Sequence, residues 1–190
     1  MKAIVTGAAG FIGYHTAARL LDEGWQGVGV DNLNDYYQVD LKDTRLSKLN
    51  TRDAFRFAQA DISDAAAFNA AIGADRDADV IVHLAAQAGV RYSIENPAAY
   101  VSANVMGQVS VFETALQLEK RPPVVYASSS SVYGANEKIP FSESDAVDHP
   151  VSVYAATKRS GELLAVSYKH VHGLHSTGLR FFTVYGPFGR

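Results

Sequence analysis

Two side chains of this sequence have the types and the spacing of a proton-transfer pair. Tyr154 and Lys158 lie four residues apart in a stretch with helical periodicity, which places both on one face of a helix. There an ammonium group can lie near a phenol. The serine run at residues 128–131 ends a strand-like stretch, where a hydroxyl could hold the oxygen of a reacting group. A tyrosine and a lysine at this spacing often have no joint role, so the interpretation depends on the rest of the chain.

A glycine-rich stretch, TGAAGFIG at residues 6–13, follows a strand-like run and opens a helical one. Glycines in this setting allow a tight turn and a close approach to a pyrophosphate, and the helix N-terminus offers free N–H groups. Asp31 closes the next strand-like run, where a carboxylate can bond to an adenosine ribose and would repel a 2′-phosphate. The pattern favours NAD over NADP. The alternative is a glycine-rich turn that binds nothing.

A bound nicotinamide would complete the chemistry of the tyrosine. Free tyrosine has a pKa of about 10, so a phenolate that acts as a base near neutral pH needs roughly 4 kcal/mol of stabilisation. Lys158 and the positive nicotinamide ring could supply this together. The combination therefore predicts removal of a proton from a substrate hydroxyl next to a hydride acceptor.

Six short runs rich in β-branched residues alternate with helical stretches or long connections. Parallel strands need such crossovers, so the pattern predicts a doubly wound α/β domain, a Rossmann fold with one parallel sheet, over residues 1–190. Residues 32–53 are expected to form a loop with a short helix, and residues 136–150 a surface loop before a helix. The predicted strands are residues 2–6, 27–31, 55–60, 80–84, 124–128 and 176–182.

Composition narrows the possible partners. A net charge of −3 gives no basic stripe for nucleic acid, and the absence of cysteine excludes disulfides and thiolate zinc sites. The six histidines show no metal-ligand spacing. There is no cationic leader and no long apolar run, so we expect a cytoplasmic protein without a membrane segment.

Several motifs together resemble the extended short-chain dehydrogenase/reductase family, in its nucleotide-sugar epimerase branch. Besides the glycine stretch they include LAAQAG at residues 84–89, YASSSSVYG at 126–134, YAATK at 154–158 and RFFTVYGPFGR at 180–190. DNLNDYYQVDLKDTRL at 31–46 and HPVSVYAATK at 149–158 are similar to UDP-glucuronate 4-epimerases.

The resemblance implies an NAD site and a catalytic group. Ser129, Tyr154 and Lys158 match the catalytic residues of the family, with Tyr154 taking the proton of the sugar 4-hydroxyl. The residues implied to contact NAD are Gly7, Gly10, Phe11, Ile12, Gly13, Asp31, Asn32, Asp61, Ile62, Leu84, Ala85, Ala86, Gln87, Asn104, Tyr154 and Lys158. Asp61 alone would more often cap a helix than contact an adenine.

The implied reaction is epimerisation at C4 of a UDP-sugar through a 4-keto intermediate, with UDP-glucuronate to UDP-galacturonate as the first choice. Family dehydratases carry an Asp-Glu pair where this chain has Ser130 and Ser131, and hydroxyls are poor acids and bases. Ser130, Ser131 and Thr183 are therefore expected to hold the glucuronate carboxylate. Arg190 would be a charged partner of the carboxylate and Arg91 could reach sugar hydroxyls, although both can equally be surface charges.

Other interpretations remain open at this stage. The substrate could be UDP-glucose or a UDP-N-acetylhexosamine, or the protein could be a dehydratase, an oxidoreductase or a non-catalytic nucleotide sensor of the same fold. Family members continue into a smaller nucleotide-sugar domain, so we expect this chain to be a fragment that binds NAD and turns over little sugar. The resemblance also implies a homodimer through the helix of Tyr154 and a helix over about residues 97–118, packed as a four-helix bundle.

Overall fold

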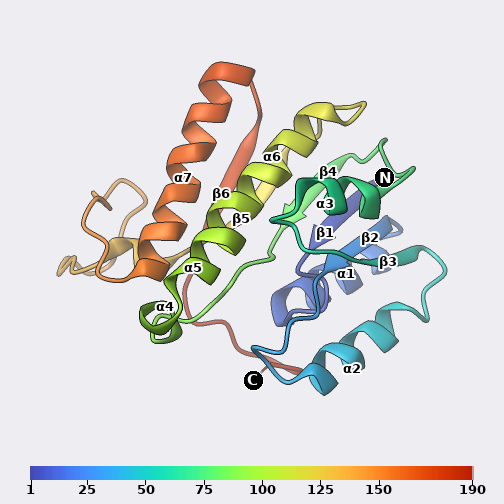
Figure 1. The fold of residues 1–190 in the computed structure, drawn as a ribbon, viewed down its shortest axis with the longest axis horizontal. Helices are drawn as coiled ribbons and strands as arrows, with labels where there is room; N and C mark the ends of the chain where they lie inside the picture. Colours follow the sequence, from blue (N-terminus) through green and yellow to red (C-terminus); the bar gives the residue numbers. More distant parts are fainter. Residues whose placement is uncertain (190) are drawn as a thin grey trace.

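A single parallel sheet forms the centre of the protein. A computed structural model describes residues 1–189, and its six strands lie in the order β3-β2-β1-β4-β5-β6 (Figure 1). All neighbouring strands are parallel. Every predicted strand is confirmed within one residue at each end. The strands are β1 (Lys2–Thr6), β2 (Gln26–Asp31), β3 (Phe55–Gln59), β4 (Val80–His83), β5 (Val124–Ser129) and β6 (Ser176–Phe181).

The strand order reverses direction at β1. The chain first builds outward from β1 to β2 and β3, then returns to add β4 on the other side of β1, followed by β5 and β6. Connections after β1 and after β4 therefore leave in opposite directions. In open α/β sheets this reversal leaves a crevice at the carboxyl ends of the strands, where ligands bind. Asp31 and Ser129, the last residues of β2 and β5, both lie at this edge.

Helices cover both faces of the sheet, as the alternation of side chains along each strand requires. Ile4 of β1 packs into a core with α3 (Ala65–Ile72), α6 (Gly107–Gln117) and α7 (Val153–His172). Its neighbours Ala3 and Val5 pack on the opposite face with α1 (Phe11–Asp22) and α2 (Val39–Leu49). The doubly wound architecture predicted from the sequence is confirmed. Among residues 1–189, no helix is long and apolar enough to cross a membrane.

The helix predicted over about residues 97–118 contains an unexpected π-helical section. It consists of α5 (Pro97–Tyr100), a π-helical segment (Val101–Met106) and α6, which follow one another without a break. The widened turn contains Asn104, which bonds to a neighbouring loop and to α7. Such π-helical turns recur at functional sites. As predicted, residues 32–53 contain one short helix, α2, and residues 136–150 form a loop without helix or strand. The remaining short elements are α4 (Tyr92–Glu95) and a 3-10 turn (Ser130–Tyr133).

A partly buried ion pair fixes α7 against the sheet. The carboxylate of Glu162 accepts hydrogen bonds from the guanidinium of Arg180 on β6 at 2.8 and 3.0 Å and from the hydroxyl of Ser128 on β5 at 2.7 Å. Burial tends to raise the pKa of Glu162, but the bonds from Arg180 and Ser128 hold it below its ordinary value. This pair sets the position of α7, which begins at the cap formed by Ser152 and carries Tyr154 in its first turn.

Replacing Glu162 tests this anchor. We expect Glu162→Gln to lower the free energy of unfolding at pH 7 by about 2 kcal/mol, because hydrogen bonds to a charged group are lost. The pKa of Glu162 is lower in the folded protein, so its stabilisation is present above its ordinary pKa of 4.5 and is lost as pH falls through the folded value. Urea unfolding between pH 3 and 7 should therefore show a weaker acid dependence for the variant. Glu119→Gln, at an exposed position, is the control. Identical stability curves for Glu162→Gln and the parent protein would contradict the anchor.

Candidate active site

A cavity of about 980 Å³ opens along the carboxyl edge of the sheet. It is lined from the strand ends of β1, β2, β3, β4, β5 and β6, so residues far apart in sequence meet there. Most of the residues predicted to contact NAD line it. These are Gly7, Gly10, Phe11, Ile12, Gly13, Asp31, Asn32, Asp61, Ile62, Leu84, Ala85, Ala86, Gln87 and Tyr154.

The glycine turn has a geometry that only glycine permits. Gly7 has φ of 73°, and a Cβ there would lie 2.7 Å from the backbone nitrogen of Ala85, in the loop after β4. A Cβ on Gly13 would overlap the carbonyl oxygen of Gly7. Helix α1 begins after Gly10, and its first N–H groups have no side-chain cap. Free N–H groups at a helix start, beside a backbone without side chains, fit the pyrophosphate of a dinucleotide.

Asp31 is held rigidly at one end of the cavity. Its carboxylate is 7% exposed and accepts hydrogen bonds from the backbone N–H groups of Ala9 at 3.1 Å and Leu33 at 2.9 Å. Asp61, after β3, accepts a bond from the side-chain amide of Asn32 at 3.0 Å. Asp61 does not cap α3, because Asp64 does. The arrangement places two carboxylates and an amide where an adenosine ribose would lie.

Two buried cations of α2 were missed by the sequence analysis. The Nζ of Lys42 lies 3.8 Å from the Asp31 carboxylate and donates to the carbonyl of Asn34 at 2.7 Å. The guanidinium of Arg45 donates to the carbonyl of Ala9 at 2.9 Å, and burial lowers its pKa. Both residues line the cavity, as do Asn34, Tyr36 and Tyr37 of the preceding loop. The sequence offered only the three-residue spacing of two cations as a signal, and that spacing is common on exposed helices.

Ser129 and Tyr154 meet at the other end of the cavity. Ser129 is 7% exposed, and its hydroxyl bonds to that of Ser131 at 3.1 Å. Burial raises the pKa of the Tyr154 phenol, and a hydrogen bond with Ser129 opposes this shift without cancelling it. The sequence predicts a stabilised phenolate when a nicotinamide is bound beside Lys158. In the protein alone the direction is the opposite, because burial removes water from the phenol, so the phenol is neutral at pH 7.

Lys158 lies beneath Tyr154 and is almost completely enclosed. Its Nζ donates to the carbonyl of Ala127 on β5 at 3.0 Å and lies 5.9 Å from the centre of the Tyr154 ring. Burial lowers its pKa to about 8. The predicted proximity of the ammonium and the phenol is therefore present, one helical turn apart on α7. A lysine with this pKa is charged at neutral pH but close to losing its proton.

Several predicted site residues lie outside the cavity lining. Asn104 uses its side chain to bond the backbone of Gln87 and the hydroxyl of Thr157, so it joins the β4 loop to α7. Arg91, Ser130 and Ser131 do not line the cavity either, whereas Thr183 does. Arg190 lies outside the described residues. Phe181, Phe182 and Val184 also line the cavity beside Thr183 and were not predicted.

The fold and this cavity define a dinucleotide-type α/β domain with a serine, tyrosine and lysine at one end of the cleft. Residues 3–190 match the family described as NAD dependent epimerase/dehydratase family, and the chain belongs to it. The resemblance inferred from the motifs is thus confirmed.

Individual relatives point in the same direction. The chain is 50% identical over 190 residues to a probable UDP-glucuronate 4-epimerase of Rhizobium meliloti strain 1021, covering 100% of this chain and 55% of that protein. Among solved structures it is similar to the UDP-glucuronic acid 4-epimerase of Bacillus cereus in complex with UDP-glucuronic acid and NAD, with a TM-score of 0.88 and 35% identity over 100% of this chain and 59% of that one. The chain is also similar to a UDP-glucose 4-epimerase of Thermus thermophilus in complex with NAD. The TM-score is 0.84 and the sequence identity is 30%, over 98% of this chain and 57% of that one. The chain spans about half the length of the curated relatives it matches.

The buried Lys158 predicts a distinct dependence of stability on pH. Between pH 8 and its ordinary pKa of 10.5, the unfolded chain keeps a proton that the folded chain has lost. The free energy of unfolding should therefore rise with pH across this window, by up to about 3 kcal/mol from this group. Urea unfolding of Lys158→Met should lack this contribution. Lys169→Met, at an exposed position of the same helix, should retain it. A rise of equal size in both variants would mean that Lys158 is not the titrating group.

Proposed function

We propose that the whole protein is an NAD-dependent 4-epimerase that interconverts UDP-glucuronate and UDP-galacturonate. The observation that carries the proposal is the meeting of Ser129 and Tyr154, above a buried Lys158, in the same cavity as the glycine turn. The relatives named as UDP-glucuronate 4-epimerases support the choice of substrate. Residues 1–190 would then be the NAD-binding domain that carries the catalytic residues.

The cofactor site follows the lining of the cavity. The glycine turn from Gly7 to Gly13 would hold the pyrophosphate, and Asp31 with Asn32 the adenosine ribose. Asp61 and Ile62 would border the adenine, and residues 84–87 the nicotinamide half. Lys158 would bond the nicotinamide ribose from below. Asn104 would act indirectly, because its side chain holds the backbone of Gln87.

Tyr154 and Ser129 would handle the proton of the sugar. NAD, when bound, would supply the hydride acceptor for C4 and a second positive charge besides that of Lys158. Tyr154 would take the proton of the 4-hydroxyl while Ser129 holds the same oxygen, which leaves a 4-keto sugar once the C4 hydrogen has departed as hydride. The keto sugar would rotate in the site and receive the hydride on its other face, and Tyr154 would give the proton back. No net oxidation results.

The serine run favours epimerisation over elimination of water. Ser130 and Ser131 offer hydroxyl groups where an elimination would need an acid and a base. We propose that these serines, with Thr183 on the cavity wall, bind the sugar carboxylate, that Arg190 is its charged partner, and that Arg91 reaches the sugar hydroxyls. Ser130 and Ser131 do not line the cavity themselves, but the hydroxyl of Ser131 bonds to that of Ser129, which does.

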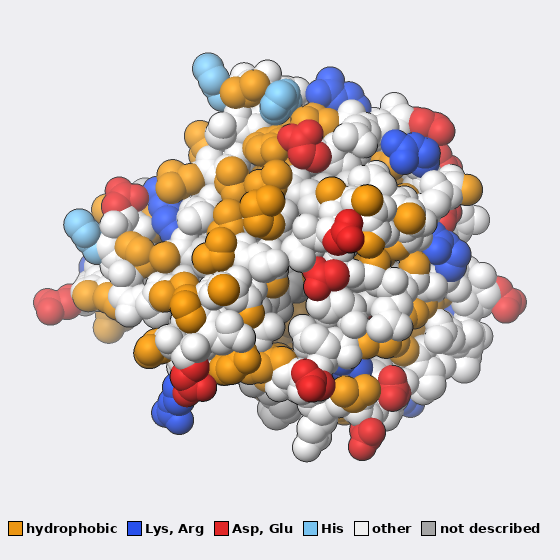
Figure 2. Space-filling model, in the orientation of Figure 1, with side chains coloured by type: hydrophobic (Ala, Val, Ile, Leu, Met, Phe, Trp, Pro, Cys, Tyr) orange, Lys and Arg blue, Asp and Glu red, His pale blue; other side chains and the backbone are white. Residues whose placement is uncertain are grey.

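We further propose that the protein is a cytoplasmic homodimer. Exposed apolar side chains lie on the outer surface of α7 and on that of the continuous helix formed by α5, the π-helical segment and α6. Figure 2 shows hydrophobic groups gathered on this face. A shallow depression runs between the two helices beside Leu163. Two copies of this helix pair would bury these groups as a four-helix bundle. The exposed side chains are Val101, Met106, Leu163, Val166 and Val171.

Epimerisation is tested with the whole protein and UDP-glucuronate, followed by NMR of the sugar. We expect the C4 epimer to appear without net NADH. Tyr154→Phe should reduce the rate at least about a hundredfold, because the phenol that carries the proton is missing. Tyr168→Phe, which removes a phenol hydroxyl bonded to Glu113 near the other end of α7, should keep the parent rate. Stoichiometric NADH, loss of carbon dioxide or a dehydrated sugar would contradict epimerisation, and turnover of UDP-glucose alone would move the specificity to the alternative substrate.

The dimer surface is tested by one charged substitution. Val166 is 69% exposed on α7, and Val166→Glu would place two carboxylates within the proposed bundle. We expect the whole protein to shift from dimer to monomer in analytical ultracentrifugation. Ile139→Glu, at an exposed loop position, should leave the mass unchanged. A dimer that persists in Val166→Glu, or a monomeric parent protein, would contradict this surface.

A further inference from the structure

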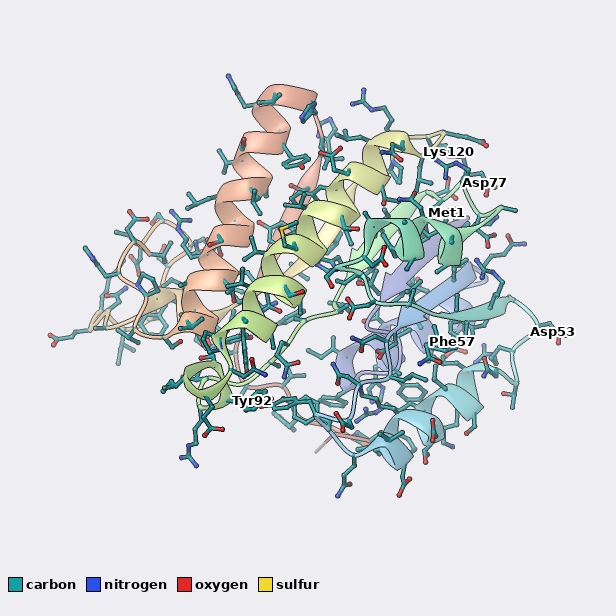
Figure 3. All side chains as sticks on the ribbon, in the orientation of Figure 1. Met1, Asp53, Phe57, Asp77, Tyr92 and Lys120 are labelled. Atoms are coloured by element: carbon teal, nitrogen blue, oxygen red, sulfur yellow. The ribbon has the colours of Figure 1, made fainter. Side chains whose placement is uncertain are left out.

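Three tyrosines connect the loop after β2 to the loop after β4. Tyr36 belongs to the first loop and lines the cavity. Its ring stacks on that of Tyr92 at the start of α4, with centroids 4.8 Å apart and planes at 28°. Figure 3 shows Tyr92 at the lower edge of the molecule, between α4 and the chain that enters α2. We call Tyr36, Tyr92 and Tyr100 the tyrosine clasp.

The backbone of the β4 loop is shaped to receive Tyr36. Gly89 has φ of 99°, and a Cβ there would lie 2.7 Å from the hydroxyl oxygen of Tyr36. The hydroxyl of Tyr100 donates a hydrogen bond that is shared by two backbone carbonyls, that of Ala88 at 2.8 Å and that of Gly89 at 2.7 Å. Burial, and then a hydrogen bond with Tyr36, raise the pKa of Tyr100. The close fit therefore depends on glycine at position 89.

The clasp also reaches the catalytic residue. The fully buried ring of Tyr100 meets the ring of Tyr154 edge to face, with centroids 6.1 Å apart. Tyr92 is not part of the cavity lining, whereas Tyr36 and Tyr154 are. A continuous row of aromatic rings thus runs from the loop beside Asp31 to the serine and tyrosine at the other end of the cavity.

The position of the clasp follows from the strand order. Strands β2 and β4 lie on either side of β1, and the glycine turn ends β1. A bridge of side chains between the loops after β2 and β4 must cross the cleft in front of this turn. A dinucleotide that extends from Asp31 to Tyr154 would pass between the glycine turn and the Tyr36–Tyr92 stack.

We propose that the tyrosine clasp retains the cofactor by closing over it, and that Tyr36 and Tyr92 act through their stack. This inference rests on the proposed epimerase function. The reaction needs such retention, because the hydride taken from C4 must return to the same sugar. If NADH left after the first half of the cycle, the 4-keto sugar would be stranded. Release of the cofactor then requires the stack to separate.

The test measures release of NADH from the whole protein. The protein is loaded with NADH, mixed with excess NAD, and followed by the fluorescence of the nicotinamide. We expect release at least tenfold faster for Tyr36→Ala and for Tyr92→Ala. The double variant should be no faster than the faster single variant, because both substitutions break one stack. Tyr36→Phe keeps the ring and should release NADH more slowly than Tyr36→Ala, and Tyr168→Phe should match the parent protein.

The outcomes separate the clasp from the epimerase. Parent-like release from Tyr92→Ala would overturn the clasp, and so would fully additive effects, which would mean that Tyr36 contacts the ligand independently. Tyr92→Leu keeps apolar bulk without a ring and should also release NADH faster, which covers the case in which Tyr92→Ala does not fold. If the parent protein epimerises UDP-glucuronate but the variants release NADH at the parent rate, the clasp alone is overturned. A parent protein that binds no NADH overturns both proposals.

Discussion

The close packing of the glycine turn against the loop after β4 is the constraint on which the site depends. A Cβ on Gly7 would come within 2.7 Å of the Ala85 nitrogen, and one on Gly13 would overlap the Gly7 carbonyl. Because the turn is this tight, α1 starts at the floor of the cavity with its N–H groups free, and Asp31 reaches the N–H of Ala9. A larger residue at Gly7 or Gly13 would force the turn away from the loop after β4 and displace the start of α1. The carboxyl ends of β2 and β4 would then no longer face one cavity.

A second constraint brings α7 to this cavity. It also explains why the phenol of Tyr154 is neutral in the protein alone. Glu162 fixes the helix to β5 and β6, so Tyr154 meets Ser129 and Lys158 lies below them. Enclosure then acts on both groups, raising the pKa of Tyr154 and lowering that of Lys158 to about 8. Both shifts favour neutral groups. In the proposed function a further positive charge, besides that of Lys158, comes with the cofactor, which ties the reactivity of Tyr154 to an occupied site.

The sequence predicted those parts of the site that depend on local order along the chain. The strands follow from β-branched runs, the turn from its glycines, and the shared face of Tyr154 and Lys158 from helical spacing. It did not predict the contact of Tyr36 with Tyr92 or that of Lys42 with Asp31, because both depend on the path of the loop after β2, which composition does not encode. The resemblance assigned Asn104 to the cofactor, but its bond to Gln87 depends on a π-helical turn that helical periodicity does not reveal. The spacing of Tyr154 and Lys158 gave their proximity but not their burial, which raises the pKa of Tyr154 in the protein alone.

In the proposed reaction, the C4 hydrogen leaves and returns on a cofactor that stays bound. UDP-glucuronate deuterated at C4 tests this claim most directly. The whole protein is incubated with this substrate, with excess unlabelled NADH and with no other reductant. If the reaction proceeds as proposed, both epimers keep deuterium at C4 at equilibrium, and none appears in water or in the free NADH. Loss of deuterium from C4 to water or to free NADH would contradict direct return of the hydride. Exchange of the C5 hydrogen with full retention at C4 would show a different reaction.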